Sequence, residues 1–247
     1  MTLLTDKRVV ITGGGSGIGA DMALAFAEAG AEVTITGRRE SALRKVADQH
    51  NHVDFAIVDV TDEAAMVACF ENIGRIDIVI ANAGAAESAP FAKTSFEQWQ
   101  RMLNVNLSGV FLTLREGLKQ LNDGGRLIAV ASTAGLKGYA YVGAYCAAKH
   151  GVVGLVRSLA AETATRNITV NALCPGFTDT PLLAASVDNI VAKTGQSAEQ
   201  ATAHFESTNP TGRLVTPAEV TATALWLCGP NSGAISGQAI SISGGEV

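Results

Sequence analysis

The 247-residue sequence has little of the chemistry that builds metal centres and disulfide frameworks. It contains four cysteines and no Cys-x-x-Cys pair; they are Cys69, Cys146, Cys174 and Cys228. This spacing suits neither zinc nor a set of disulfides, so we interpret them as reduced thiols of a cytoplasmic protein. The histidine pair His50 and His52 has no further ligands nearby in the sequence. We therefore predict no metal site.

The sequence also lacks a basic surface pattern and a long hydrophobic run. Its 18 basic and 23 acidic residues give a net charge of −5 with no basic stripe, so we expect no nucleic-acid partner. No run of about 18 apolar residues occurs, and no signal peptide is recognisable at the N-terminus, so we expect no membrane partner. Charged residues make up only 17% and hydrophobic residues 47%, a balance typical of a sheet buried on both faces.

Short apolar runs alternate with helical patterns along the whole chain. Alternation of this kind predicts a parallel sheet with helices on both faces. We predict an α/β fold: a single doubly wound Rossmann-like domain over residues 1–247 with about seven strands. One long helix is expected from about Phe96 to Leu121, and residues 176–213 are expected to form a substrate lid over the carboxyl ends of the strands. The predicted strands are Arg8–Thr12, Glu32–Thr36, Val53–Val58, Ile76–Ala81, Gly125–Ala131, Ile168–Leu173 and Ala239–Ile242.

A glycine-rich turn joins the first predicted strand to the first helix. Residues 12–19 read TGGGSGIG. Glycines there allow positive φ angles and close approach of the backbone to a pyrophosphate, which the helix N-terminus would attract. The position between a first strand and a first helix makes a dinucleotide site the favoured interpretation, although a glycine-rich turn by itself can be an ordinary loop.

The end of the second strand bears on which dinucleotide binds. A site selective for NAD usually places an acidic residue there, whereas this chain has Arg38 and Arg39. Arginines suit the 2′-phosphate of NADP, so NADP is the predicted cofactor and NAD the alternative. Two solvated arginines at a helix start are the alternative interpretation, and Glu40 could neutralise one of them.

The most informative residues lie in the second half of the chain. Tyr145 and Lys149 are four residues apart in Tyr-Cys-Ala-Ala-Lys, on one face of a helix, and Ser132 precedes them by thirteen residues. An ammonium beside a phenol favours the phenolate, so Tyr145 is expected to act as an acid/base nearer neutral pH. Taken singly, Ser132 would be a turn residue and Tyr145 a core residue.

Together these motifs resemble the short-chain dehydrogenase/reductase family over nearly the whole chain. Thr12–Gly19 matches the family's TGxxxGxG turn, Asn82-Ala83-Gly84 its NAG motif, and Pro175-Gly176 its motif after the sixth strand. Asn106, Ser132, Tyr145 and Lys149 match its active-site set. The chain departs from the pattern at Ala81, where the family often has asparagine, and it has no basic residue inside the glycine turn.

The resemblance implies a hydride transfer between NAD(P)(H) and a carbonyl or secondary alcohol. Tyr145 would exchange the proton, Ser132 would orient the substrate, Lys149 would lower the pKa of Tyr145 and hold the nicotinamide ribose, and Asn106 would support a proton-relaying water. A capping or sheet-bridging amide is the alternative for Asn106. The expected cofactor-binding residues are Gly13, Gly15, Ser16, Gly17, Ile18, Gly19, Arg38, Arg39, Asp59, Val60, Asn82, Ala83, Gly84, Tyr145, Lys149, Pro175, Gly176, Phe177, Thr178 and Thr180.

The small-molecule substrate is less constrained. The lid sequence is similar to that of 3-oxoacyl thioester reductases, 3-hydroxyacyl-CoA dehydrogenases and polyketide ketoreductases, which favours a β-keto substrate. A cyclic or aromatic secondary alcohol or ketone is the alternative, and a nucleotide-sensing protein on the same fold is the non-enzyme alternative. The resemblance also implies a homotetramer or homodimer formed through the helices at 96–121 and 144–165, with the C-terminal residues 244–247 near a subunit contact.

Overall fold

The computed structural model describes residues 3–247, and its centre is a parallel sheet of seven strands. The strands are β1 (Arg8–Thr12), β2 (Glu32–Gly37), β3 (Val53–Ile57), β4 (Ile76–Ala81), β5 (Leu121–Val130), β6 (Thr169–Pro175) and β7 (Ala239–Ile242). Their order is β3-β2-β1-β4-β5-β6-β7. The order reverses between β1 and β4, which is the crevice where open α/β sheets bind ligands. The predicted doubly wound fold is confirmed.

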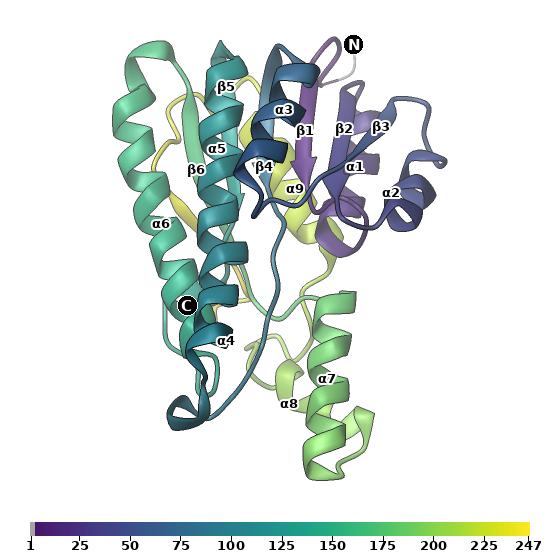
Figure 1. Cartoon of the computed structure of the whole chain (residues 1–247), viewed down its shortest axis with the longest axis vertical. Coiled ribbons are helices and arrows are strands. Elements are labelled where there is room, and N and C mark those ends of the chain that lie inside the picture. Colours follow the sequence, from purple (N-terminus) through teal and green to yellow (C-terminus); the bar gives the residue numbers. More distant parts are fainter. Residues whose placement is uncertain (1–2) are drawn as a thin grey trace.

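Helices cover both faces of the sheet and extend beyond its carboxyl edge (Figure 1). One face carries α1 (Gly17–Glu28), α2 (Glu40–Ala47) and α9 (Pro217–Cys228). The other carries α3 (Glu63–Ile73), α5 (Gly109–Gln120) and α6 (Gly143–Thr163), with α4 (Phe96–Leu103) continuing past the sheet. Two further helices, α7 (Pro181–Thr194) and α8 (Ala198–Glu206), lie beyond the ends of the strands.

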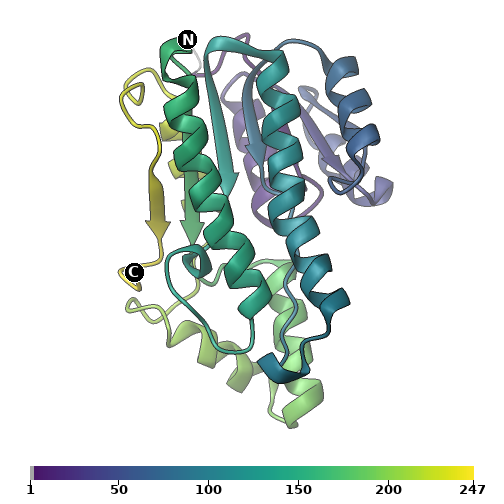
Figure 2. The same ribbon diagram turned by 60° about the vertical axis from the view of Figure 1, so that its left-hand side comes forward.

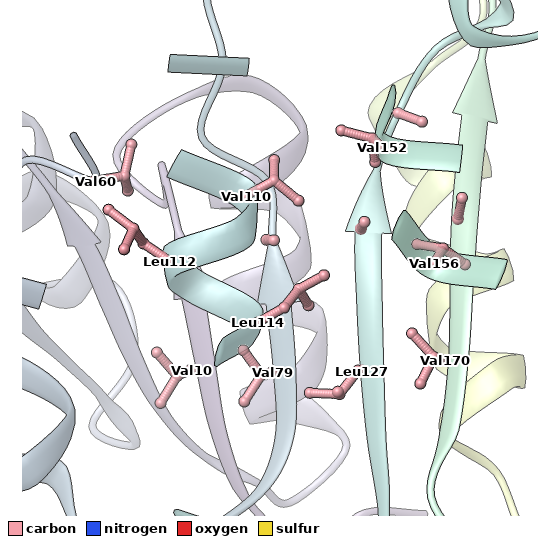
Figure 3. Close-up of a cluster of buried hydrophobic side chains, with 14 of the residues drawn as sticks. Val10, Val60, Val79, Val110, Leu112, Leu114, Leu127, Val152, Val156 and Val170 are labelled. Atoms are coloured by element: carbon pink, nitrogen blue, oxygen red, sulfur yellow. The ribbon is translucent and has the colours of Figure 1, made fainter. Parts of the chain in front are cut away.

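Alternate residues of each strand pack into separate cores on the two faces. Val10, Val79 and Leu127 point toward α5 and α6, where they meet side chains such as Leu114 and Val156 (Figure 3). Their neighbours along the strands belong to the core under α1, α2 and α9. Burial of one such side chain stabilises the fold by roughly 1.5–3 kcal/mol. Because side chains alternate between the two faces along each strand, helices pack against both faces of the sheet. This packing supports the strand ends that form its carboxyl edge.

The prediction of one continuous helix from about Phe96 to Leu121 is wrong, because the helix is interrupted. A π-helical turn, Asn104–Ser108, separates α4 from α5. Its buried member is Asn106, whose side-chain amide bonds the backbone of Ala85 in the loop after β4. A π turn adds one residue to a helical turn and so changes the direction in which a side chain points. Hydrophobic periodicity continues through such an insertion, so the sequence pattern does not reveal it.

The segment after β6 folds into the two lid helices with a small core of their own. Leu183 and Val187 of α7 pack with Ala201 and Phe205 of α8. The helix ends are well defined: Thr180 caps α7, and Ser197 and Gln200 form a capping box at α8. Figure 2 shows that β7, the last strand, points toward the end of the molecule where α7 and α8 lie. None of the helices within residues 3–247 is both long and apolar enough to cross a membrane.

Candidate active site

A large cleft lies at the carboxyl edge of the sheet, between the strand-end loops and the lid. Its volume is about 1730 Å³. Every predicted catalytic and cofactor-binding residue lines it except Gly19. The structure therefore brings together residues from the segments that follow β1 to β6, as expected for loops at one edge of a parallel sheet.

The turn between β1 and α1 forms the floor of one end of the cleft. Gly13 and Gly17 have positive φ angles of 69° and 55°, which glycine adopts without strain. The side chain of Ser16, the N-cap residue, makes no capping hydrogen bond, and the first turn of α1 has no acidic residue. The first backbone N–H groups of α1 thus remain available to an anion such as a pyrophosphate.

Gly19 has a packing role behind this turn. A Cβ there would overlap the Asn82 side chain and lie 2.5 Å from the carbonyl oxygen of Gly13. Asn82 itself donates to the carbonyls of Thr12 and Gly13 at 3.0 and 3.2 Å. This amide ties the end of β4 to the glycine turn, so Asn82 holds the shape of the floor as well as lining it.

The two arginines at the end of β2 lie at the rim of the cleft. Arg38 is 3.7 Å from the Asp59 carboxylate, and its side chain is 74% exposed. Glu40 pairs with Arg44 at 2.7 Å instead of with Arg38 or Arg39. The possibility that Glu40 neutralises Arg38 or Arg39 is therefore contradicted. Arg38 and Arg39 both line the cleft, and their binding of a 2′-phosphate stays a prediction.

Ser132, Tyr145 and Lys149 line the cleft together. Ser132 follows β5, and its hydroxyl accepts from the backbone N–H of Ala134 at 3.1 Å. It is also near enough to the Tyr145 phenol to lower the pKa of that phenol. One helical turn separates Tyr145 from Lys149 on α6, and the lysine Nζ lies 5.6 Å from the centre of the tyrosine ring. That Nζ is buried and donates to the carbonyl of Val130 at 2.8 Å.

Burial is the largest cause of the pKa shifts of Tyr145 and Lys149. It raises the pKa of Tyr145 to about 12, against the lowering effect of the Ser132 hydrogen bond. It lowers the pKa of Lys149 to about 8. Desolvation disfavours the charged forms of both groups, and the expected effect of Lys149 on Tyr145 stays a prediction. At neutral pH, Tyr145 is a protonated acid beside a protonated lysine.

Asn106 is fully engaged by the backbone around it. Its Nδ2 donates to the carbonyls of Ala85 and Met102 at 2.9 and 3.0 Å, and its Oδ1 accepts from the Ala85 N–H at 3.1 Å. The amide thus joins the π turn to α4 and to the loop after β4, and not two strands as in the sheet-bridging alternative. A Cβ on Gly84 would lie 3.0 Å from Asn106 Oδ1 and 3.8 Å from Lys149 Nζ, so glycine leaves this junction open. The proposed water relay stays a prediction.

The lid closes one side of the cleft against the glycine turn. A Cβ on Gly17 would lie 3.2 Å from Cγ2 of Thr180, the residue that caps α7. Further along α7, Asn189 donates to the hydroxyl of Ser88 at 3.1 Å and so spans from the lid to the loop after β4. Sequence reasoning did not find Ser88, Asn189 or the lining residue Phe205, because no motif marks contacts between segments about 100 residues apart.

The residues present fit a dinucleotide. The glycine cradle, the uncapped α1 terminus and the basic rim lie along one continuous cleft. Within residues 3–247, no three His, Cys, Asp or Glu side chains are placed to hold a metal ion together.

Comparison with known proteins agrees with this geometry. A family model described as Enoyl-(Acyl carrier protein) reductase matches residues 13–246. The chain is 34% identical to a putative ketoacyl reductase of Streptomyces coelicolor, over 99% of this chain and 98% of the relative. It is 34% identical to a D-beta-hydroxybutyrate dehydrogenase of Rhizobium meliloti, over 97% and 98% respectively. It is 32% identical to the 3-oxoacyl-[acyl-carrier-protein] reductase FabG of Chlamydia muridarum, over 99% and 98%.

A solved structure is similar throughout. The crystal structure of a variant of actinorhodin polyketide ketoreductase with NADPH superimposes with a TM-score of 0.92 at 33% identity. The match covers 100% of this chain and 99% of the other. These matches favour an enzyme over the nucleotide-sensing alternative. The chain therefore belongs to the short-chain dehydrogenase/reductase family and is an NAD(P)-dependent oxidoreductase.

Proposed function

We propose that this enzyme reduces the keto group of a 3-oxoacyl or similar β-keto substrate, with NADPH as its cofactor. The observation that carries the proposal is the Ser132, Tyr145 and Lys149 group lining a cleft with a cradle for phosphates at one end. The relatives named as ketoacyl and 3-oxoacyl reductases support the substrate class. The NADPH-bound ketoreductase and the two rim arginines support the cofactor.

The proposed reduction requires a protonated acid in the site. Reduction of a ketone requires a proton donor at its oxygen, and burial keeps the Tyr145 phenol protonated. The Ser132 hydroxyl lies beside the phenol and would hydrogen-bond the same substrate oxygen. Lys149, anchored on Val130, places a positive charge near the oxygen on which negative charge develops.

Residues of the chain would hold the cofactor at three places. The α1 terminus would bind the pyrophosphate, Arg38 and Arg39 the 2′-phosphate, and Lys149 the nicotinamide ribose. The cofactor, when bound, supplies the hydride that adds to the carbonyl carbon. The protein contributes orientation of the substrate and stabilisation of the charge on its oxygen.

One observation favours a second candidate substrate. Three aromatic side chains, Tyr139, Phe177 and Phe205, line the cleft on the lid side. Their rings are in contact, with centroids 5.7 Å apart for the first pair and 4.7 Å for the second. Such a surface would also accept a cyclic or aromatic ketone with no thioester.

An assay of cofactor absorbance with NADPH and NADH separately tests the proposal. We expect faster oxidation of NADPH in the presence of an acetoacetyl thioester than with simple cyclic or aryl ketones. Activity restricted to the ketones would favour the second candidate. Binding of nucleotide with no oxidation of cofactor by any of these substrates would overturn the proposed reaction.

We also propose that residues 1–247 act as one domain with a lid at 176–213, in a cytoplasmic homotetramer. Supporting the assembly, α5 presents Phe111 with 43% of its surface exposed, on the helix expected to form a subunit contact. An exposed aromatic side chain of this size is typical of interfaces.

A further inference from the structure

The side chain of Glu246 lies against Tyr139, a residue that lines the cleft. The Glu246 side chain is only 3% exposed. One carboxylate oxygen accepts from the Tyr139 hydroxyl at 2.6 Å and lies 3.0 Å from the Lys137 ammonium. A Cβ on Gly176 would lie 3.3 Å from its other oxygen. A buried carboxylate is thus paired and hydrogen-bonded just behind the wall of the cleft, as a buried charge requires.

A short hydrogen-bonded chain connects Glu246 to the residue next to Ser132. The Tyr139 phenol has one proton, and a carboxylate can only accept, so that proton points to Glu246. The Thr133 hydroxyl lies 2.7 Å from the same phenol oxygen and therefore donates to it. Burial and the carboxylate raise the pKa of Tyr139 well above its ordinary value, so this phenol stays a donor and does not compete with Tyr145 as the acid.

Tyr139 in turn supports the aromatic surface of the cleft. Its ring meets Phe177 edge to face, at an interplanar angle of 77°, and Phe177 contacts Phe205 of the lid. The Lys137 ammonium lies 5.0 Å from the centre of the Tyr139 ring. We call Tyr139, Phe177 and Phe205 the aromatic wall. It runs from the loop after Ser132 to α8.

The loop that carries Tyr139 needs such support. Tyr141, two residues later, has a φ of 68°, a left-handed conformation that is costly for a non-glycine residue. Conformations of this kind persist only where surrounding contacts fix them. The Ala89 N–H, which donates to the Tyr141 carbonyl at 2.8 Å, is one such contact, and the Glu246 to Tyr139 hydrogen bond is another.

We propose that Glu246 is a positioning residue that holds Tyr139 in the aromatic wall, and that this wall binds a flat, aromatic acyl group of the β-keto substrate. The proposal rests on the proposed function. The carboxylate fixes the ring through the phenol, while Lys137 neutralises its charge from behind. The face toward the substrate therefore remains apolar, and a planar group can stack there. A small acyl group such as acetoacetyl gains little from the wall.

The test compares a small and an aromatic substrate, an acetoacetyl and a benzoylacetyl thioester, in four variants. Glu246→Ala and Tyr139→Phe should each raise KM for the benzoylacetyl thioester about tenfold, the loss of one charge-assisted hydrogen bond. In Glu246→Ala, whose altered side chain is not among those lining the cleft, the kcat and the KM for the acetoacetyl thioester should change less than about twofold. Glu246→Gln, which still accepts from the phenol, should restore most of the KM. Glu71→Gln, an exposed residue of α3, is the matched control.

Coupling between the two residues is the sharper criterion. The double variant of Glu246→Ala and Tyr139→Phe should bind no worse than either single variant, since both remove the same hydrogen bond. Additive losses, or equal losses of kcat on both substrates, would overturn the proposal and leave Glu246 with a general structural role.

Binding of the reduced phenyl product, measured by calorimetry, tests the wall without turnover. We expect the Kd of this product to follow the KM changes. An unchanged Kd in both single variants would overturn the proposal. If the wild-type enzyme reduces neither thioester but binds the phenyl product in this pattern, the proposed reaction fails while the wall stands.

Discussion

Two tyrosines six residues apart illustrate how the surroundings decide the chemistry of a side chain. Tyr139 donates to the Glu246 carboxylate, which keeps its proton in place. Tyr145 faces Ser132 and the open cleft, where its proton can be transferred to a substrate oxygen. The residue type is the same, but only Tyr145 has a hydroxyl that is not committed to a buried carboxylate. This difference supports the proposal that Tyr145 is the acid.

Tyr145→Phe should remove the acid and leave the binding surfaces intact. We expect kcat to fall by about 10² to 10⁴, the usual contribution of a positioned proton donor. The Kd for NADPH should remain within about twofold of the wild-type value. Steady-state kinetics and a fluorescence titration measure the two quantities. A variant with near wild-type kcat would show that another group supplies the proton.

Arg38→Asp should reverse the cofactor preference. Loss of a charge-assisted hydrogen bond of about 1.5–3 kcal/mol raises the KM for NADPH roughly tenfold or more. The KM for NADH should change little or fall, because the new carboxylate can accept from a ribose hydroxyl. Arg75→Asp, an exposed position before β4, serves as the control. Equal effects on the two cofactors would refute the assignment of Arg38 to the 2′-phosphate.

The buried Lys149 should make stability depend on pH in a particular direction. Its pKa is about 8 in the folded chain and near 10.5 when unfolded. Between these values the unfolded chain binds a proton that the folded chain has lost, so the free energy of unfolding rises with pH. The gain is about 3 kcal/mol at most.

Lys149→Met removes the titrating group and provides the reference. As the pH rises from about 8 to 10.5, the free energy of unfolding of the wild type should increase relative to that of Lys149→Met. Urea unfolding of the cofactor-free protein at several pH values measures this difference. A difference that stays constant across the window would mean that the lysine keeps its ordinary pKa on folding.

At the scale of single elements, α5 depends on close contact with the sheet. A Cβ on Gly117 would lie 2.9 Å from Cγ2 of Val79 on β4. In an isolated helix, Gly→Ala would be favourable by about 1 kcal/mol. Here the added methyl group meets a buried valine that has no room to rotate, and overpacking of this kind costs about 1–3 kcal/mol. Gly117→Ala should therefore destabilise the protein.

Val79→Ala provides the partner for a double-mutant cycle. By itself it should destabilise the protein by about 2 kcal/mol, through lost burial and a cavity. Combined with Gly117→Ala, it frees the space that the new methyl group needs, so the double variant should lose less than the sum of the two. Thermal unfolding measures all three. Strict additivity would show that α5 moves away from β4 instead of clashing with it.

At the scale of the whole molecule, the proposed assembly makes α5 a contact surface. Phe111→Glu places a charge on its most exposed aromatic position, and charges are depleted at interface cores. We expect multi-angle light scattering to show a shift from tetramer to smaller species. Ile57→Glu, at the exposed end of the edge strand β3, should leave the mass unchanged. A wild-type protein that is already monomeric would contradict the proposal.

The sequence by itself determined the fold class and the carboxyl edge as the site, and it placed Tyr145 and Lys149 on one helix face. These features follow from local rules: the alternation of strands and helices, the glycines of a tight turn, and the spacing of side chains on one helix face. The membership of Ser132 in the group was implied by the family resemblance. Because they follow from the same local rules, the strand positions were correct to within a few residues, apart from the start of β5. That strand begins at Leu121, beside a register irregularity after Ile76 that no pattern indicates.

Only the tertiary structure decided the features that depend on contacts across the chain. The π turn at Asn106 exists because its amide meets Ala85, 21 residues earlier. The pKa of Tyr145 follows from desolvation on burial, which outweighs the lowering effect of Ser132. Glu246 reaches Tyr139 across 107 residues, a distance over which periodicity and propensity carry no information. Local patterns fix which elements form, and packing fixes which side chains meet.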